Sequence, residues 1–343
     1  MFDSMSAPHA YKAPRLADVA AAAGVSVPTV SRVLNGTKYV APDLAERVRV
    51  AVEELGYRPN TAARSMRSGR RTLVSVLAGA TANYGYAMTL QGIETEARRA
   101  GMSVTITVVE SDAETDVRRA SDLALSQPTA GAIVLEFDGA GIETGRTLPA
   151  NLPVVVAGGG NRRSGDRPAA LIDEQAAAQQ ATEYLLRLGH RTVHHIAGPA
   201  EGKTSGRTSG WRAALAAADV PVPETMYATW DAASGYSWGE RIAAREDVTA
   251  VLCGNDEIAI GLMRALADRH VRVPEEVSVI GFDDQPLVSM WQPSLTTIDQ
   301  DFEGLGARAF RLLGELVSGQ EAVEDSVTTP ALVVRESTAP PGR

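Results

Sequence analysis

The sequence predicts a small all-α helix-turn-helix head that is joined by a hinge helix to a larger, two-lobed α/β body. Three observations predict this fold class. Two short amphipathic helices meet at a glycine near the N-terminus, basic residues are concentrated in the same region, and strand-like apolar runs alternate with helical periods from residue 73 onward. With 343 residues and 44% apolar content, the chain can form two or three domains with large cores.

The first predicted helix covers residues 16–23, where apolar residues recur at three- and four-residue steps. Gly24 ends it, because glycine adopts a left-handed C-cap conformation without strain. Ser26 is a good N-cap for a second helix, and Pro28 falls in the first turn of that helix, where its missing N–H loses no hydrogen bond. Two helices in this arrangement form a helix-turn-helix, whose second helix can lie in the DNA major groove. On pattern alone, a helical packing unit that binds nothing remains an alternative.

The third helix is predicted to begin at Pro42 and Asp43 and to end at Gly56. Residues 60–71, N-T-A-A-R-S-M-R-S-G-R-R, follow it, and Asn60 can cap a short helix there. In the free protein this segment could equally be a solvated basic linker, because so short a helix is marginal alone in water. Residues 1–14 show no periodicity and are predicted to be a disordered tail.

The net charge of −9 is distributed unevenly. Residues 1–71 contain 11 basic and 6 acidic residues, so this part of the chain carries +5 and the remaining 272 residues carry −14. A basic head on an acidic body attracts phosphate at one end only. The single cysteine, Cys253, excludes an internal disulfide. This cysteine usage and the absence of a signal peptide or a long apolar run predict a cytoplasmic protein with no membrane partner.

The pattern L-x-D-V-A-x-x-A-G-V-S-x-x-T-V-S-R-V-L-N (residues 16–35) resembles the DNA-binding signature of the lactose/galactose repressor family. The resemblance is ungapped and continues over residues 40–60, which look like the third helix of that family and the start of its hinge. It implies a transcriptional regulator, a repressor, that binds a pseudo-palindromic, double-stranded DNA operator as a homodimer. It also implies a small polar effector, a mono- or disaccharide, and we expect neither a cofactor nor catalytic residues.

In this family the second helix presents side chains to the bases at the positions of Val27, Pro28 and Arg32. Val27 and Pro28 can contact only apolar groups such as a thymine methyl, whereas Arg32 can pair with guanine through two hydrogen bonds. Thr29 and Ser31 suit phosphate contacts, with helix capping as the alternative. Met66 stands where the family usually inserts a leucine into the minor groove. The full set of expected DNA contacts is Leu16, Ser26, Val27, Pro28, Thr29, Ser31, Arg32, Asn35, Tyr39, Asn60, Ala63 and Met66.

From Leu73 the alternation of strands and helices predicts parallel sheets with helices on both faces. The resemblance implies a body like the two-lobed periplasmic binding proteins, in which the chain crosses between the lobes three times. The predicted lobes are residues 72–170 with 300–329, and residues 171–299 with 330–343. Pro340 and Pro341 exclude a continuing helical tail, so we expect assembly to stop at a dimer.

The resemblance also implies an effector cleft. Sugars need planar polar groups for their hydroxyls and an aromatic face for their C–H side. The expected cleft residues are Asn83, Tyr84, Tyr86, Arg207, Trp230, Asn255, Asp283 and Phe302. Core packing of Trp230 and helix capping by Asp283 are the alternatives. Gly158 stands where one member of that family has a ligand-binding aspartate, so the identity of the ligand does not carry over.

The main competing function is a P-loop-like nucleotide-hydrolysing enzyme. Residues 197–204, A-G-P-A-E-G-K-T, fit a relaxed phosphate-loop spacing. The next residues, S-G-R-T-S-G, are poor helix formers, and we expect the following helix only over residues 209–218, although a phosphate loop must lead directly into a helix. A free sugar-binding receptor is disfavoured by the head. His190, His194 and His195 have no accompanying ligands at metal-binding spacing, so no metal site is predicted.

Overall fold

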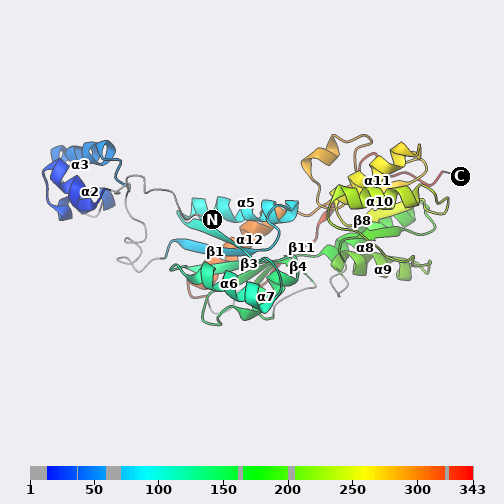
Figure 1. Ribbon diagram of the computed structural model, residues 1–343, viewed down its shortest axis with the longest axis horizontal. Coiled ribbons are helices and arrows are strands. Elements are labelled where there is room, and N and C mark those ends of the chain that lie inside the picture. The colour runs from blue at the N-terminus through cyan, green and yellow to red at the C-terminus, as the bar shows by residue number, and fades with distance from the viewer. Residues whose placement is uncertain are drawn as a thin grey trace, which may run out of the picture. The chain divides into compact units, whose positions relative to one another are not determined.

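The computed structural model describes residues 14–36, 38–58, 71–160, 165–199, 205–320 and 324–342 (Figure 1). The chain divides into two compact units, residues 1–71 and 72–343. The predicted hinge positions Asn60, Ala63 and Met66 lie outside the described residues, as do residues 1–13 of the predicted tail. Among the described residues, no helix combines the length and the apolar character that crossing a membrane requires.

The head consists of the helices α1 (Leu16–Ala23), α2 (Val27–Asn35) and α3 (Pro42–Glu54). Gly24 has a φ of 61°, and the Ser26 side chain accepts a hydrogen bond from the Thr29 N–H at 3.3 Å. Both features confirm the predicted turn. Val19, Val30 and Val48 are fully buried at the centre of the three helices, so the apolar stripes close on one small core.

The first lobe contains a sheet of six strands, β1 (Leu73–Ala78), β2 (Ser103–Val108), β3 (Gly131–Glu136), β4 (Val154–Gly159), β5 (Ala169–Ile172) and β11 (Ser326–Thr328). All paired neighbours are parallel, in the order β11-β5-β4-β3-β1-β2. Its helices are α5 (Tyr84–Arg99), α6 (Glu114–Leu125), α7 (Gly139–Thr147) and α12 (Phe302–Val317). The helices α5 and α12 cover one face, and α6 and α7 cover the other (Figure 1).

The second lobe has a smaller parallel sheet of four strands, β6 (His194–Ala197), β7 (Met226–Tyr227), β8 (Ala250–Cys253) and β9 (Ser278–Ile280). Its helices are α8 (Glu174–Arg187), α9 (Gly206–Ala217), α10 (Ala232–Ile242), α11 (Asp256–Asp268) and the 3-10 turn η1 (Pro286–Ser289). The helices α8 and α9 enclose one core with the sheet, and α10 and α11 enclose the other. Both sheets therefore form the layered α/β arrangement that the alternating pattern predicts.

Three chain segments connect the lobes. The first follows β5, the second contains β10 (Thr297–Asp299), and the third contains β12 (Ala331–Val333). The strands β10 and β12 pair with each other in antiparallel fashion. The boundary expected after residue 170 falls inside β5, which pairs with β4 in the first sheet, so the first crossing begins after Ile172.

The expected start of helix α9 at residue 209 is wrong. The helix begins at Gly206, because Ser205 acts as its N-cap and accepts a hydrogen bond from the Thr208 N–H at 3.2 Å. Cap geometry outweighs the poor helix propensity of the glycine and serine residues here. The short strands β5, β7, β10, β11 and β12 and the helices α7 and α10 were not predicted by the alternating pattern.

Close contact between helices depends on glycine at several positions in the body. A β-carbon on Gly261 of α11 would lie 1.9 Å from the Ala232 carbonyl oxygen at the start of α10. A β-carbon on Gly306 of α12 would lie 2.1 Å from the Thr89 carbonyl oxygen of α5. In both helix pairs the obstacle is backbone, which cannot rotate away as a side chain can.

We therefore expect Gly261→Ala to lower the free energy of unfolding by about 1–3 kcal/mol through overpacking. Gly314→Ala is the matched control, because this helical position of α12 has no atom within 4 Å of the added β-carbon. It should raise stability by about 0.5–1 kcal/mol, since alanine is the better helix former. Urea unfolding followed by circular dichroism measures both, and equal stabilities of the two variants would contradict the packing argument.

Candidate functional site

The head presents one exposed face of α2. Val27 is 40% exposed although it is a large apolar residue, and Pro28 and Arg32, four residues apart on the same helix, are exposed as well. Tyr39, in the turn before α3, is also exposed. The second helix of a helix-turn-helix contacts base edges through its N-terminal residues. The residues that the sequence singled out for base reading are therefore accessible.

The polar residues of α2 make local hydrogen bonds. The Ser26 and Thr29 hydroxyl oxygens lie 2.8 Å apart, and the Asn35 side-chain amide donates to the Ser31 carbonyl oxygen at 2.8 Å. Ser26 thus caps α2, and Thr29 is its hydrogen-bonding partner in the first turn. Leu16, expected to contact DNA, is half-buried and packs against the head's core.

The body contains a cavity of about 280 Å³ with walls from both lobes. All eight residues expected in the effector cleft line it, namely Asn83, Tyr84, Tyr86, Arg207, Trp230, Asn255, Asp283 and Phe302. Its volume is close to the lower end of the range of about 300–1,000 Å³ that is typical of small-molecule sites. The carboxyl ends of the parallel strands meet here, as in other open α/β sheets that bind ligands.

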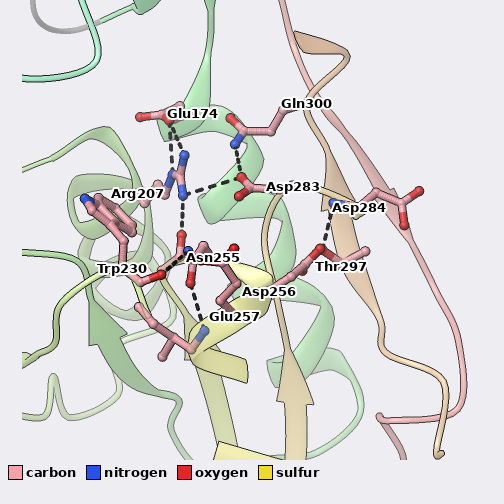
Figure 2. Close-up of polar contacts among 12 residues, drawn as sticks. Glu174, Arg207, Trp230, Asn255, Asp256, Glu257, Asp283, Asp284, Thr297 and Gln300 are labelled. Atoms are coloured by element: carbon pink, nitrogen blue, oxygen red, sulfur yellow. Dashed lines mark hydrogen bonds and ion pairs between the residues drawn. The ribbon is translucent and has the colours of Figure 1, made fainter. Parts of the chain in front are cut away.

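Arg207 is the central polar residue of the cavity (Figure 2). Its Nε and Nη2 atoms donate to Glu174 Oε1 at 3.0 and 2.7 Å, and Nη1 donates to the Gly254 carbonyl oxygen. The guanidinium carbon also lies 4.5 Å from the centroid of the Phe282 ring and 5.5 Å from that of Trp230. Ion pairing, hydrogen bonding and ring stacking therefore fix this side chain in one position.

Asp283 lies on the other side of Arg207. Its Oδ1 is 3.8 Å from Arg207 Nη1 and accepts a hydrogen bond from Gln300 Nε2 at 2.6 Å. Burial raises the pKa of Asp283 to about 7, although Arg207 and the Gln300 hydrogen bond act in the opposite direction. The helix capping considered for Asp283 does not occur, because Asp283 precedes no described helix as its N-cap.

Asn255 has a structural role in addition to its place in the wall. As the N-cap of α11, it accepts a hydrogen bond from the Ile258 N–H at 2.9 Å, and its amide donates to the Trp230 carbonyl oxygen at 3.0 Å. The Trp230 ring lies directly against Gly198, where a β-carbon would be 2.2 Å from the ring. Trp230 therefore offers a fixed aromatic surface.

The first lobe contributes an aromatic wall. Phe302 makes edge contacts with Tyr84 and Phe137, whose ring centroids lie 6.2 and 5.8 Å away. Tyr86 donates from its hydroxyl to Asp138 at 2.5 Å, and Asp138 also caps α7. Asn83 precedes α5 and is exposed at the cavity.

Sequence reasoning missed several polar residues in the walls, namely Glu136, Asp138, Glu174, Glu257 and Gln285. Glu174 had a usable signal, because it follows Asp173, which caps α8, at the end of β5. That strand has only four residues, so the pattern did not reveal it. Asp138 opens the glycine-rich helix α7, whose composition is unlike a helix.

The glycine at position 158 has a steric explanation. A β-carbon there would lie 2.6 Å from the Glu136 carbonyl oxygen of the adjacent strand, so an aspartate does not fit without movement. The next glycine, Gly159, lines the cavity, and its β-carbon position is 3.1 Å from Glu174 Oε2. A carboxylate from α8 therefore stands beside the end of β4.

Two further features of the sequence are the three histidines and the Walker-like loop, residues 197–204. His195 is fully buried, bonded to the Leu252 carbonyl oxygen and the Thr208 hydroxyl, and burial lowers its pKa to about 4. Residues 200–204 of the loop lie outside the described residues. In the described part of the chain, no group of three or more His, Cys, Asp or Glu residues could hold a metal ion.

Comparison with known proteins gives matches to both units. Residues 15–60 match the model of the bacterial regulatory proteins of the lacI family, and residues 182–338 match that of the periplasmic binding protein-like domain. The chain is 30% identical to the transcriptional regulator DegA of Bacillus subtilis over 94% of this chain and 97% of DegA. It is also 30% identical to the lactose operon repressor of Escherichia coli over 95% of this chain and 91% of that protein.

Solved structures are similar over nearly the whole chain. The Lac repressor dimer bound to operator and the anti-inducer ONPF shares 29% identity, with a TM-score of 0.83 over 96% of this chain and all of that one. The complex of the regulator CelR with cellobiose shares 30% identity, with a TM-score of 0.68 over 94% of this chain and 99% of that one.

The raised pKa of Asp283 predicts a pH dependence of stability. Between about pH 4, where an ordinary carboxyl titrates, and about pH 7, the folded state binds more protons at Asp283 than the unfolded state. The stabilisation is therefore present at low pH and is lost as the pH rises through this window. Asp283→Asn should flatten the dependence of the unfolding free energy on pH between 5 and 7.5. Asp268→Asn, an exposed change on α11, is the control, and an unaltered slope in Asp283→Asn would contradict the assignment.

Proposed function

Because this chain belongs to the lacI family of bacterial regulatory proteins, we propose that it is a transcriptional repressor whose affinity for a pseudo-palindromic operator changes when a small polar molecule, a mono- or disaccharide, binds in its body. The observation that carries this proposal is the presence of two separate sites in one chain. The head exposes the reading face of α2, and the body contains a polar cavity with aromatic walls.

The chemistry of the cavity supports a polyhydroxylated effector. Carboxylates at Glu174 and Asp283 can accept hydrogen bonds from sugar hydroxyls, and Trp230 and Phe302 offer faces to the C–H side of a sugar ring. The lactose operon repressor and the regulator CelR, which the chain resembles, are named for or solved with sugars. Gly158 offers no side chain to a sugar hydroxyl, and the Glu136 carbonyl oxygen occupies the space that a β-carbon there would need.

The proposed response to the effector follows from the wall composition. Residues of the first lobe, such as Tyr84, and of the second lobe, such as Arg207, line the same cavity. A ligand that contacts both walls stabilises the closed arrangement over the open one, and the three connecting segments allow the lobes to move as bodies. Closure then shifts the surfaces by which two copies associate, and with them the spacing of the two heads.

Exposed apolar residues on the body support a homodimer. Ile106 is 52% exposed on β2, an edge strand of the first sheet, and Val108 on the same strand is also exposed. Met290, beside η1 in the second lobe, is 82% exposed. An unpaired edge strand with apolar side chains is prone to association, and a two-fold dimer matches a two-fold operator.

A nucleotide-hydrolysing enzyme is the second candidate, and one observation favours it. Helix α9 begins directly after the Walker-like loop, contrary to the expectation. However, Ser205 already satisfies the Thr208 N–H, and Arg207 binds Glu174. The relatives are transcriptional regulators rather than enzymes. Magnesium-dependent ATP hydrolysis by the purified protein would favour this second function.

The DNA-binding proposal is tested with an operator selected by the protein from a random duplex library. We expect Arg32→Ala to weaken binding to that operator by about 1–3 kcal/mol and to relax one base position, because Arg32 is the long polar donor of the reading face. Arg98→Ala, the same charge change on the body, is the control. Equal affinities of Arg32→Ala and the parent protein would contradict the role of Arg32, and failure to select any sequence would contradict operator binding itself.

The dimer proposal is tested by a substitution on the edge strand β2. Ile106→Glu places a charge on the edge strand, so we expect monomers in light scattering at micromolar concentration and at least roughly tenfold weaker operator binding. Val222→Glu, at another exposed valine, should remain dimeric. A dimeric Ile106→Glu protein would show that β2 does not form the interface, and a parent tetramer would contradict assembly as a dimer.

A further inference from the structure

A fully buried carboxyl group, that of Asp256, lies next to the cavity without lining it. Asp256 is the first residue of α11 and follows the cap residue Asn255. Figure 2 shows it close to Asp283 and Thr297, on the far side of Asn255 from Trp230. Burial of a carboxyl group is unfavourable unless it is hydrogen-bonded, so the hydrogen-bond partners of Asp256 indicate what it does.

The two oxygen atoms of Asp256 bind two different chain segments. Oδ1 accepts a hydrogen bond from the Thr297 hydroxyl of β10 at 2.5 Å, and Oδ2 accepts one from the Gln285 N–H at 2.8 Å. The Asp256 N–H donates to the Phe282 carbonyl oxygen at 2.8 Å. One residue therefore connects α11, the loop after β9 and the segment that crosses between the lobes.

The loop held by Asp256 has an unfavourable backbone conformation. Asp283 and Asp284 have φ angles of 118° and 50°, in a region that residues with a β-carbon rarely adopt. Such a conformation persists only where surrounding contacts over-determine it. The contacts here include the Gln285 N–H bond to Asp256, the bond of the Asp283 N–H to the Ile298 carbonyl oxygen at 2.8 Å and the ion pair of Asp284 with Arg335 at 2.7 Å. This loop carries two cavity residues, Asp283 and Gln285.

The segment on the other side of Asp256 also leads to the cavity. The strand β10 is followed by Gln300, which donates to Asp283, and by Phe302, the first residue of α12 in the first lobe. Gly281 leaves the necessary space, because a β-carbon there would lie 2.2 Å from Asp256 Oδ1. Both segments that Asp256 binds thus carry wall residues, one for each lobe.

We propose that Asp256 is a positioning residue for effector binding, which holds the Asp283 loop and the start of the crossing segment in the geometry that the ligand requires. This inference rests on the proposed effector-regulated function. It assigns Asp256 no contact with the ligand or with DNA. Removal of its side chain therefore acts on the effector response and leaves operator binding by the head unchanged.

The charge state of Asp256 indicates which substitution preserves its role. Burial, reinforced by the nearby Asp283, raises the pKa of Asp256 well above its ordinary value. Asparagine is neutral and has the shape of this side chain. Its amide oxygen can accept from the Gln285 N–H as Oδ2 does, and its amide N–H can donate to the Thr297 oxygen, because a hydroxyl group both donates and accepts. Asp256→Asn is therefore the conservative variant, and Asp256→Ala removes both bonds.

The experiment compares the parent protein, Asp256→Ala, Asp256→Asn and the control Asp268→Ala, which removes a more exposed acid from the same helix. Hydrogen exchange of the full-length, ligand-free proteins reports the loop and the crossing segment directly. Glucose, galactose, lactose and cellobiose are the calorimetric probes of the cavity. The selected operator reports on the head.

In Asp256→Ala we expect at least roughly tenfold faster exchange over residues 281–285 and 297–302, unchanged exchange in the interior of α8, and at least roughly tenfold weaker binding of the sugar that the parent binds. Operator affinity without sugar should stay within about twofold, and Asp256→Asn should restore exchange and sugar affinity. A general fold defect would instead accelerate exchange throughout the body and would not spare α8.

The proposal is overturned if Asp256→Ala exchanges and binds sugar as the parent does, or if Asp256→Asn is as impaired as Asp256→Ala. General acceleration of exchange in Asp256→Ala also overturns it, since Asp256 would then maintain the fold rather than position the wall. A parent protein that binds its operator but none of the four sugars contradicts the sugar proposal alone, and the exchange measurement then decides the role of Asp256 by itself.

Discussion

The buried ion pair between Arg207 and Glu174 is the interaction on which the rest of the cavity depends. It joins the first turns of α8 and α9, and both side chains are largely withdrawn from solvent. A buried charge without its partner is strongly unfavourable, so neither residue can change position alone. With Arg207 fixed, Asp283 and the Trp230 ring have a rigid neighbour on the inner side of the cavity. The arrangement of these cavity walls therefore depends on an interaction that lies within one lobe.

Much of the fold could be predicted from periodicity and caps. The turn at Gly24 and Ser26 forms as expected, because each residue satisfies a local requirement that the sequence displays. The alternation of strands and helices likewise identified most of both sheets. The local sequence pattern did not predict elements whose formation depends on contacts between residues distant in sequence. Short strands such as β5 owe their existence to pairing with neighbours, and α9 begins early because Ser205 caps it.

In the site, too, some residues could be predicted from the sequence and others could not. The eight cavity residues expected from a family resemblance do line one cavity, since they sit at strand ends and helix starts that the fold brings together. Glu174 was missed because its importance lies in a bond to Arg207, 33 positions along the chain. The roles of Asn255 as a cap and of Asp256 as a buried link were equally invisible. Sequence patterns identify residues that line the cavity better than residues that hold those residues in place.

The helix pairs that meet at glycine have a mechanical consequence. Gly261 of α11 lies against the backbone of α10, and Gly306 of α12 lies against the backbone of α5, so no side-chain rotation can relieve the contact at these two positions. Such a joint is stiff, because its deformation must bend the main chain itself. Each lobe should therefore move as a rigid body, and the bending should occur in the three connecting segments. Small displacements at the cavity would reach distant surfaces of the body with little attenuation.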